Sequence, residues 1–184
     1  MKKAFFSLLS VAVILMCFIA CTKDDVTPSY LMVDGVKNSL NNGYVYDKGT
    51  DASASYRTFV VEFRSESENP GSFFQMEIYS LSTESIQPGT YTYSNASPEA
   101  GMVSWVYSGT NLEYDDTNNI VRGKLVNEDN HQQVSGQVVV TQETNNRIGF
   151  TFNISFTDGN GLKKTVDGYF DKALMDKFIV NGTP

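Results

Sequence analysis

Apolar and polar side chains alternate along most of the chain after residue 29. The longest run lies at residues 148–156, where every second position is a large apolar residue: Ile148, Phe150, Phe152, Ile154 and Phe156. Successive side chains of an extended strand point to opposite faces, so this spacing puts the apolar residues on one face. No segment before the C-terminus sustains a helical periodicity. The pattern predicts an all-β domain.

Shorter runs repeat the alternation and predict further strands. Their apolar residues, again at two-residue spacing, are Phe59, Val61 and Phe63; Phe74, Met76 and Ile78; and Gly136, Val138 and Val140. Between the runs lie residues suited to tight turns, because glycine and asparagine tolerate positive φ and proline presets φ. These predicted turns are Asp34-Gly35, Asn42-Gly43, Asn69-Pro70-Gly71, Pro88-Gly89, Asn118-Asn119, Asn145-Asn146 and Asp158-Gly159-Asn160-Gly161.

The spacing of the turns indicates a sandwich or a barrel made of antiparallel hairpins. We expect about ten to twelve strands between residues 30 and 170, more than one flat sheet accommodates. The favoured fold is an antiparallel β-sandwich, with a closed calycin-like β-barrel as the alternative. Residues 30–184 are expected to form a single domain. Residues 171–180 are compatible with a short helical turn or a final edge strand.

The N-terminus has the composition of a cleaved export signal. Lys2 and Lys3 precede an uncharged, largely apolar stretch at residues 4–20, and a small residue, Ala20, comes just before Cys21. A basic start, an apolar run and a small residue at the cleavage site define a signal peptide. A membrane-spanning helix is usually flanked by polar anchors on both sides. We therefore expect residues 1–20 to be removed.

The junction Phe18-Ile19-Ala20-Cys21 resembles a lipobox, the processing site of bacterial lipoproteins, although Phe18 stands where leucine is usual. The resemblance implies that Cys21 receives a diacylglycerol and becomes the new N-terminus. Lys23, Asp24 and Asp25 then resemble the export signal of Bacteroidota surface lipoproteins, which implies display on the outside of the outer membrane. Residues 21–29 are expected to be a lipidated polar tether.

The last third of the chain is similar to the closing hairpins of small uncharacterised Bacteroidota lipoprotein domains. The similarity rests on residues 136–154 and on Val166-Asp167-Gly168-Tyr169-Phe170. Several of those domains have calycin-like or sandwich folds. The resemblance implies a setting and no activity.

The domain is acidic and lacks a cysteine pair. Removal of residues 1–20 takes away two lysines and no acids, which leaves 12 basic and 21 acidic residues and a net charge of −9. Nucleic acids and anionic lipid headgroups require clustered lysine and arginine, so both are excluded as partners. Cys17 leaves with the signal and Cys21 carries the lipid, so no disulfide within the domain is expected.

Residues that commonly catalyse reactions form no recognisable arrangement. A serine or cysteine hydrolase needs a base, yet the one histidine, His131, lies in a polar context typical of an exposed loop. Paired carboxylates for glycoside hydrolysis lack a supporting motif; the candidates are Glu62, Glu77, Glu113, Asp115 and Asp116, which the alternation mostly places among solvated positions. The oxygen-rich segments at residues 115–119 and 158–160 lack the EF-hand pattern and are interpreted as turns. We expect no enzyme activity, metal or cofactor.

Aromatic residues give the most suggestive pattern. They form three pairs at i, i+2, namely Tyr44 and Tyr46, Tyr91 and Tyr93, and Trp105 and Tyr107. Each pair is expected to share one face of its strand. Tyrosine and tryptophan stack on sugar rings and carry a polar tip for hydroxyl groups, so the pairs could form a binding platform. The alternative is that they fill the core or pair across strands.

The sequence thus predicts a surface-exposed outer-membrane lipoprotein that binds an extracellular ligand, such as a glycan, as an accessory to nutrient capture by a transporter complex. Two non-enzymatic alternatives stay open. One is a structural or adhesive cell-surface subunit that assembles through edge strands, and the other is a lipocalin-like carrier of a small hydrophobic ligand. A carboxylate-based hydrolase is the enzymatic alternative.

Overall fold

The computed structural model describes residues 27–50, 54–131, 133–142 and 147–177. Cys21, Lys23, Asp24, Asp25 and the expected turn at Asn145-Asn146 lie outside the described residues. The strands of the described part are β1 (Tyr30–Val33), β2 (Val36–Ser39), β3 (Asn42–Gly49), β4 (Thr58–Glu68), β5 (Gly71–Tyr79), β6 (Gly89–Tyr93), β7 (Met102–Tyr114), β8 (Ile120–Asn127), β9 (Gln133–Gln142), β10 (Ile148–Thr157), β11 (Lys163–Phe170) and β12 (Leu174–Lys177). A short 3-10 turn, η1 (Glu128–Asn130), follows β8.

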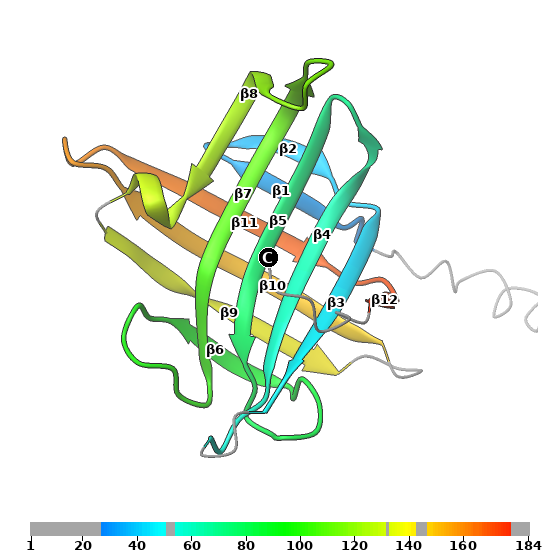
Figure 1. The fold of residues 1–184 in the computed structure, drawn as a ribbon, viewed down its shortest axis with the longest axis vertical. Helices are drawn as coiled ribbons and strands as arrows, with labels where there is room; N and C mark the ends of the chain where they lie inside the picture. Colours follow the sequence, from blue (N-terminus) through cyan, green and yellow to red (C-terminus); the bar gives the residue numbers. More distant parts are fainter. Residues whose placement is uncertain (1–26, 51–53, 132, 143–146, 178–184) are drawn as a thin grey trace, which may run out of the picture.

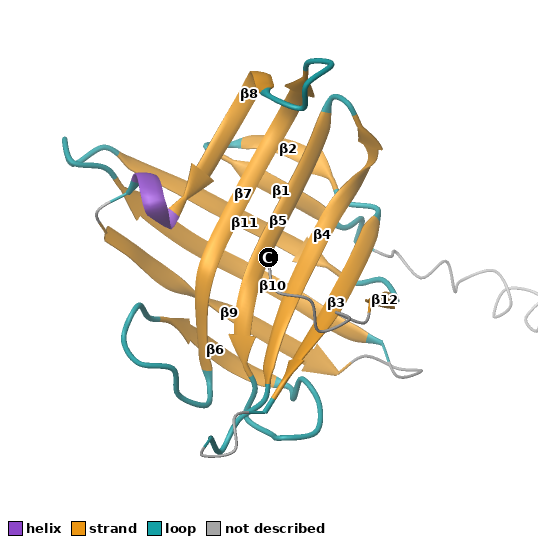
Figure 2. Ribbon diagram, in the orientation of Figure 1, coloured by secondary structure: helices purple, strands orange, loops and turns teal. Residues whose placement is uncertain are grey.

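These strands form one mixed sheet that curls into a half-barrel with two layers (Figure 1, Figure 2). Their order is β12-β3-β4-β5-β7-β6-β9-β10-β11-β1-β2, and β8 pairs with β7. Strands β12, β3, β4, β5, β7 and β8 form the front layer in Figure 1, and the remaining strands cross behind them as the back layer. The prediction of an all-β fold is confirmed.

Most neighbouring strands are antiparallel, but β12 runs parallel to β3, and β6 runs parallel to β7. The sequence predicted antiparallel pairing alone, because a parallel connection usually needs a long crossover. The contact between β6 and β7 is confined to Thr92↔Met102 and Tyr93↔Val103, at the ends of the two strands. The short connection at residues 94–101 suffices because β6 joins the back layer and meets β7 only where the layers converge.

Phenylalanines from both layers interleave in the core. Phe74 of the front layer stacks on Phe152 of the back layer, with ring centroids 4.0 Å apart and ring planes inclined by 2°. Phe63 stacks in the same way on Phe170, at 4.3 Å. All of these rings are shielded from solvent, and large aromatic side chains dominate core energetics because each buries about 150–250 Å². The space between the layers is therefore packed with side chains, as in a sandwich.

Most residues of the alternating runs occupy the expected faces of their strands. One of the predicted turns is wrong. In β10 the apolar residues from Phe150 to Phe156 are buried, while Thr151 is exposed. Residues 174–177 form an edge strand, one of the two outcomes left open for the tail. Asn42-Gly43 is the start of β3 and not a turn. A side chain at Gly43 would lie 2.6 Å from the Phe170 ring, so this glycine permits close packing there.

Replacement of Phe152 by alanine tests the interleaved core. The change removes the stacking partner of Phe74 and leaves a cavity, so the free energy of unfolding should fall by about 3–5 kcal/mol. The neighbouring substitution Thr151→Ala, on the exposed face of the same strand, should change it by less than about 0.5 kcal/mol. Urea unfolding followed by circular dichroism measures both. Equal losses in the two variants would contradict the assignment of faces.

Candidate functional site

The solvent side of β3, β4, β5, β7 and β8, here named the outer face, gathers aromatic and polar side chains. Strand pairing aligns Tyr44, Glu62, Gln75 and Tyr107 in one row across β3, β4, β5 and β7. Their chain neighbours in β4 and β5, such as Val61 and Met76, point into the core, so alternation turns the row outward.

A β-bulge in β7 brings Trp105 to the outer face. At this point the register shifts, so that β7 contains one residue more than the facing part of β5. Trp105 has a φ of 49°, a left-handed conformation that bulky residues rarely adopt. Val103 and Val106, on either side, are both buried, whereas Trp105 and Tyr107 face solvent. The bulge thus reverses the phase of the alternation within β7, as bulges near functional sites often do.

Trp105 and Tyr107 lie side by side and form what we call the aromatic corner. Their ring centroids are 4.9 Å apart and their planes are inclined by 56°, so the pair is angled and not flat. The Trp105 side chain is 40% exposed, which leaves much of its apolar surface free for contact. The Tyr107 hydroxyl donates a hydrogen bond to Asp129 of η1, and this bond raises the pKa of Tyr107 to about 12.

Tyr44 and Tyr46 border an ion pair on the same face. Arg64 donates a hydrogen bond to one oxygen of Glu62, and the Tyr46 hydroxyl donates a 3.4 Å bond to the other. Arg64 also lies over the Tyr44 ring, 5.8 Å from its centroid, and the hydrogen bond to Glu62 raises the pKa of Arg64. Glu62 is only 4% exposed, so it is not the solvated acid that the alternation predicted. Its neighbours on the outer face cover it.

Tyr91 and Tyr93 belong to the core. Tyr91 is fully buried and its hydroxyl donates a 2.7 Å hydrogen bond to the carbonyl of Gln87. Tyr93 packs against the core and donates a 2.9 Å bond to Glu128, and burial together with this carboxylate raises its pKa. Of the two roles that the sequence left open for this pair, the structure gives the core role, because both side chains lie on the side of β6 that packs against the core.

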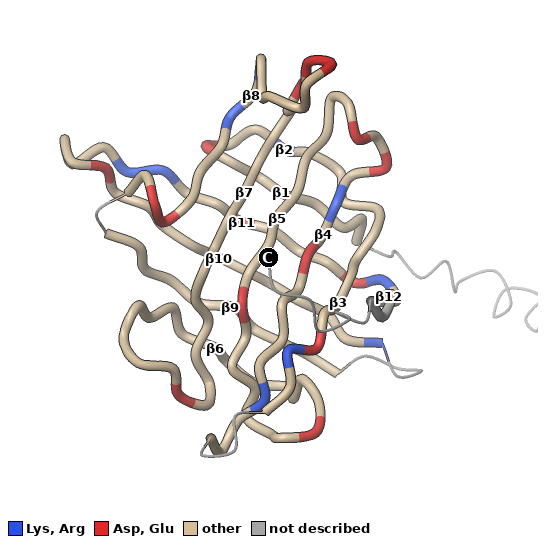
Figure 3. The backbone as a smooth tube through the Cα atoms, viewed as in Figure 1, with Lys and Arg blue, Asp and Glu red and all other residues tan. Residues whose placement is uncertain are grey.

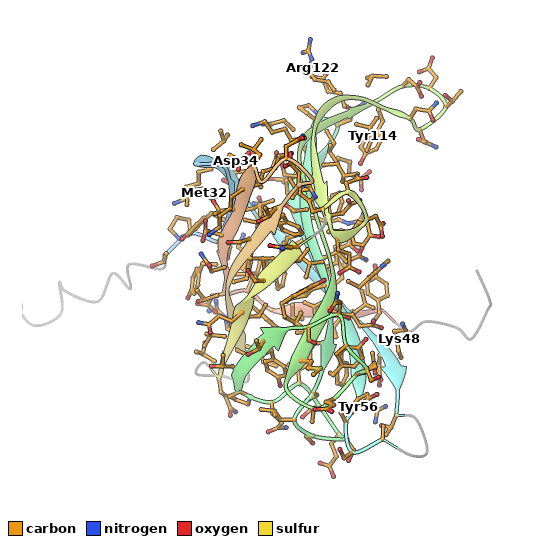
Figure 4. The ribbon with its side chains drawn as sticks, turned by 90° about the vertical axis from the view of Figure 1, so that its left-hand side faces the viewer. Met32, Asp34, Lys48, Tyr56, Tyr114 and Arg122 are labelled. Atoms are coloured by element: carbon orange, nitrogen blue, oxygen red, sulfur yellow. The ribbon has the colours of Figure 1, made fainter. Side chains whose placement is uncertain are left out.

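An open cleft of about 600 Å³ lies on the outer face, between the tips of two hairpins. These tips, of the β4–β5 and β7–β8 hairpins, are at the top of Figure 1. Glu68 and Asn69 line it from the β4–β5 hairpin, and Tyr114 and Asp116 line it from the β7–β8 hairpin. The Asn69 side chain exchanges two 3.4 Å hydrogen bonds with the backbone of Tyr114, so it ties the hairpins together. Figure 4 shows Tyr114 below the β7–β8 tip, on the side of the molecule away from Met32.

The floor of the cleft is the outer face itself, with Phe73 as its largest apolar residue. Phe73 pairs in register with Gly109 of β7. A Cβ atom at Gly109 would lie 2.6 Å from the Phe73 ring, which shows that the ring lies across the glycine. Glycine at this position therefore leaves room for the Phe73 ring against the sheet, where it lines the cleft.

The cleft is acidic. It is lined by the carboxylates Glu62, Glu68, Asp115 and Asp116, and Arg64 is its one basic residue within the described part of the chain. Asp115 accepts 2.9 Å hydrogen bonds from the backbone N–H groups of Asn119 and Thr117, and this set of bonds lowers its pKa to about 2. The carboxylates of Glu68 and Asp116 have no hydrogen-bond or ion-pair partner among the described residues. Figure 3 shows acidic positions at both hairpin tips and a basic position on β4.

The sequence did not identify Phe73, Arg64 or Tyr114 as parts of a site. A signal for Phe73 was present, since it occupies an outward position of its strand, where large aromatic residues are uncommon. Tyr114 had no such signal. It meets the β4–β5 hairpin because two segments far apart in the chain project side by side, a consequence of sheet order and not of local pattern.

His131 packs against neighbouring residues, although the sequence predicted that it lies in an exposed loop. It is half-buried, with its ring edge-on to Phe156 at 5.3 Å and its Nδ1 atom 2.7 Å from the carbonyl of Asn127. Among the described residues, no three histidine, cysteine or acidic side chains converge as metal ligands would. That part of the chain also has no helix with the length and apolarity needed to cross a membrane.

Comparison with known proteins gave no match: the chain matches no protein-family model, no curated protein and no solved structure. The geometry of the outer face is therefore the basis for a functional conclusion.

Trp105 fluorescence can report the protonation of Tyr107, because Trp105 is the sole tryptophan and the two rings are 4.9 Å apart. Since the pKa of Tyr107 is raised from 10.0 to about 12, quenching by the ionised phenol should develop toward pH 12. The stability that the bond to Asp129 contributes is present below about pH 10 and is lost as pH rises through the folded pKa.

The substitution Asp129→Asn should move the quenching transition down toward about pH 10, the ordinary pKa of tyrosine. Tyr107→Phe removes the phenol and should abolish the transition, which serves as the control. A transition already near pH 10 in the unaltered protein would be inconsistent with the bond between Tyr107 and Asp129.

Proposed function

We propose that this protein is a surface lipoprotein of the bacterial outer membrane that binds an extracellular glycan without altering it, as an accessory to nutrient capture by a transporter complex. The observation that carries the proposal is the aromatic corner. An angled pair of an exposed tryptophan and a tyrosine, next to an open polar cleft, offers apolar faces for sugar rings and polar groups for their hydroxyls.

The N-terminal sequence supports the location. A lipid on Cys21 would supply the apolar anchor. Lys23, followed by Asp24 and Asp25, resembles a surface export signal. Ser29 is buried and its hydroxyl accepts a hydrogen bond from the backbone of Asp171, so the residues between Cys21 and Ser29 would separate the folded domain from the membrane. An extended chain rises by about 3.3 Å per residue, and this tether would let the domain stand clear of the bilayer surface.

A binding role fits the cleft better than hydrolysis. Both carboxylate oxygens of Glu62 are engaged, one by Arg64 and the other by Tyr46. A general acid or nucleophile needs a carboxylate oxygen that can reach the glycosidic bond. Glu68 and Asp116 lie at the tips of separate hairpins, where solvent surrounds them. Glu62, Glu68 and Asp116 of the cleft are therefore not arranged as the acid pair of a glycosidase.

The runner-up is a structural subunit that assembles through a sheet edge. It is favoured by β8, an edge strand whose Ile120 and Val121 are 45% and 62% exposed. Unpaired edges of this kind can add a strand from another chain. Oligomers in solution that dissociate on Val121→Lys would support this alternative. The lipocalin-like alternative is disfavoured, since the phenylalanine stack fills the space between the layers.

The aromatic corner can be tested directly. Trp105→Ala together with Tyr107→Ala should abolish binding on a glycan array, because the stacking surface is lost while the core is untouched. Tyr30→Ala, in β1 of the back layer, is the matched control and should bind as the unaltered protein does. Unchanged array binding by a folded double variant would refute the proposal.

Lipidation is a separate prediction. Cys21→Ser removes the acceptor, so we expect no labelling by radioactive fatty acid and accumulation of a precursor that retains residues 1–20. Alanine at Lys23, Asp24 and Asp25 should leave labelling intact but protect the protein from protease added outside the cell, since the export signal acts as an address and not as an anchor. Full labelling of the Cys21→Ser variant would contradict the assignment.

A further inference from the structure

We infer that the ligand is an uncharged oligosaccharide chain that runs from the cleft onto the aromatic corner, and that the carboxylates of the cleft exclude acidic glycans. This inference rests on the proposed function and deepens it, because it names the ligand class and the path of the chain. The argument uses the continuity of the two surfaces, the aromatic walls at each end and the charge of the cleft.

The cleft and the aromatic corner form one continuous surface. Gln75 lines the cleft and is the direct cross-strand partner of Tyr107. Directly opposed residues of an antiparallel pair have Cβ atoms about 4.5–5.5 Å apart, so no other side chain separates the two. From Trp105 to Tyr114 the strand rises by at most about 30 Å. A ligand that contacts both ends must therefore be an extended chain and not a single sugar.

Aromatic rings flank this path at both ends. At the cleft, the Phe73 ring lies across Gly109, and Tyr114 stands on the facing hairpin. At the other end Trp105 and Tyr107 form the aromatic corner. Sugar rings have apolar faces that stack on such side chains, with tyrosine also offering a polar tip. Gln75 lies between the two ends, and Ser67 and Asn118 line the cleft, so their side chains can hydrogen-bond to hydroxyl groups of the chain.

The charges of the cleft select against acidic ligands. Four carboxylates line it, and the one guanidinium, that of Arg64, is already bonded to Glu62. Glu68 and Asp116 have free oxygens that accept hydrogen bonds from hydroxyl groups. A uronate or sulfate group brought here would be desolvated beside like charges, which disfavours binding. An uncharged chain meets the same oxygens as hydrogen-bond acceptors only.

A cationic ligand would also be attracted by these carboxylates, so the experiment must separate it from a glycan. The aromatic corner favours the glycan, because it lies outside the acidic cleft and the two carboxylates that act on Tyr107 are already engaged. Asp129 accepts a hydrogen bond from Tyr107, and Glu128 accepts one from Tyr93. Binding of an oligolysine peptide in place of saccharides would overturn the inference.

The test uses the full chain purified in a detergent without a sugar headgroup, with affinities measured by calorimetry. The probes are neutral cello-, xylo- and malto-oligosaccharides from dimer to hexamer, oligogalacturonates of matched length, and oligolysine. We expect one neutral series to bind with an affinity that rises with chain length. Oligogalacturonates should bind at least about tenfold more weakly than neutral hexamers of that series, a difference of 1.4 kcal/mol.

Three variants link the result to the structure. Tyr114→Ala and Trp105→Ala should each weaken hexamer binding by about 3- to 10-fold, because each removes one stacking contact. The double variant Glu68→Gln with Asp116→Asn should narrow the difference between neutral and acidic hexamers. The matched control, Glu84→Gln with Glu99→Gln, changes the net charge equally at exposed acids outside the cleft and should leave that difference unchanged.

The outcomes separate this inference from the proposed function. If Trp105→Ala abolishes binding and Tyr114→Ala does not change it, the cleft is not part of the path and the inference fails while glycan binding stands. Acidic and neutral hexamers that bind equally well also overturn the inference. If none of the saccharides binds, both the inference and the proposed function fail. Thermal unfolding of each variant establishes that it is folded, and Tyr114→Phe should restore binding.

Discussion

The stacking of phenylalanines between two crossing layers is the interaction on which the rest of this structure depends. Phe63 and Phe74 come from the front layer, and Phe152 and Phe170 from the back layer. Because alternate side chains of each strand enter this shared core, the remaining side chains point to the outside of the two layers. Core packing therefore fixes the position of the outer face but does not fix which residues it carries, so these residues can suit a ligand.

The cleft exists because two hairpins project past the core. β4 and β7 are the longest strands of the described part, with 11 and 13 residues, and their ends carry the tips that enclose the cleft. Asn69 joins these tips to each other, while Gly109 lets Phe73 lie on the floor between them. Rigid strands thus position the site, and the loops contribute mainly charge. Sites built in this way hold their geometry without a ligand.

Local strain in β7 has a clear consequence for the site. Left-handed backbone at a non-glycine residue costs about 1–3 kcal/mol and persists only where the surroundings impose it. At Trp105 the surroundings are Val103 and Val106, whose burial in the core requires an extra residue between two pleats. The strain is therefore offset by core packing, and its effect is to place an indole in solvent next to Tyr107. A strict alternation would have buried both rings.

The sequence by itself determined the all-β class, most of the turns and the buried faces of β4, β5, β9 and β10, because each of these follows from the two-residue period of a strand. It also indicated Trp105 and Tyr107 as neighbours. Only the tertiary structure decided that this pair faces outward while Tyr91 lies in the core, since a bulge and the choice of layer set the phase of each strand. The cleft likewise needed the sheet order, because Phe73 and Tyr114 meet through contacts between hairpins that no local pattern encodes.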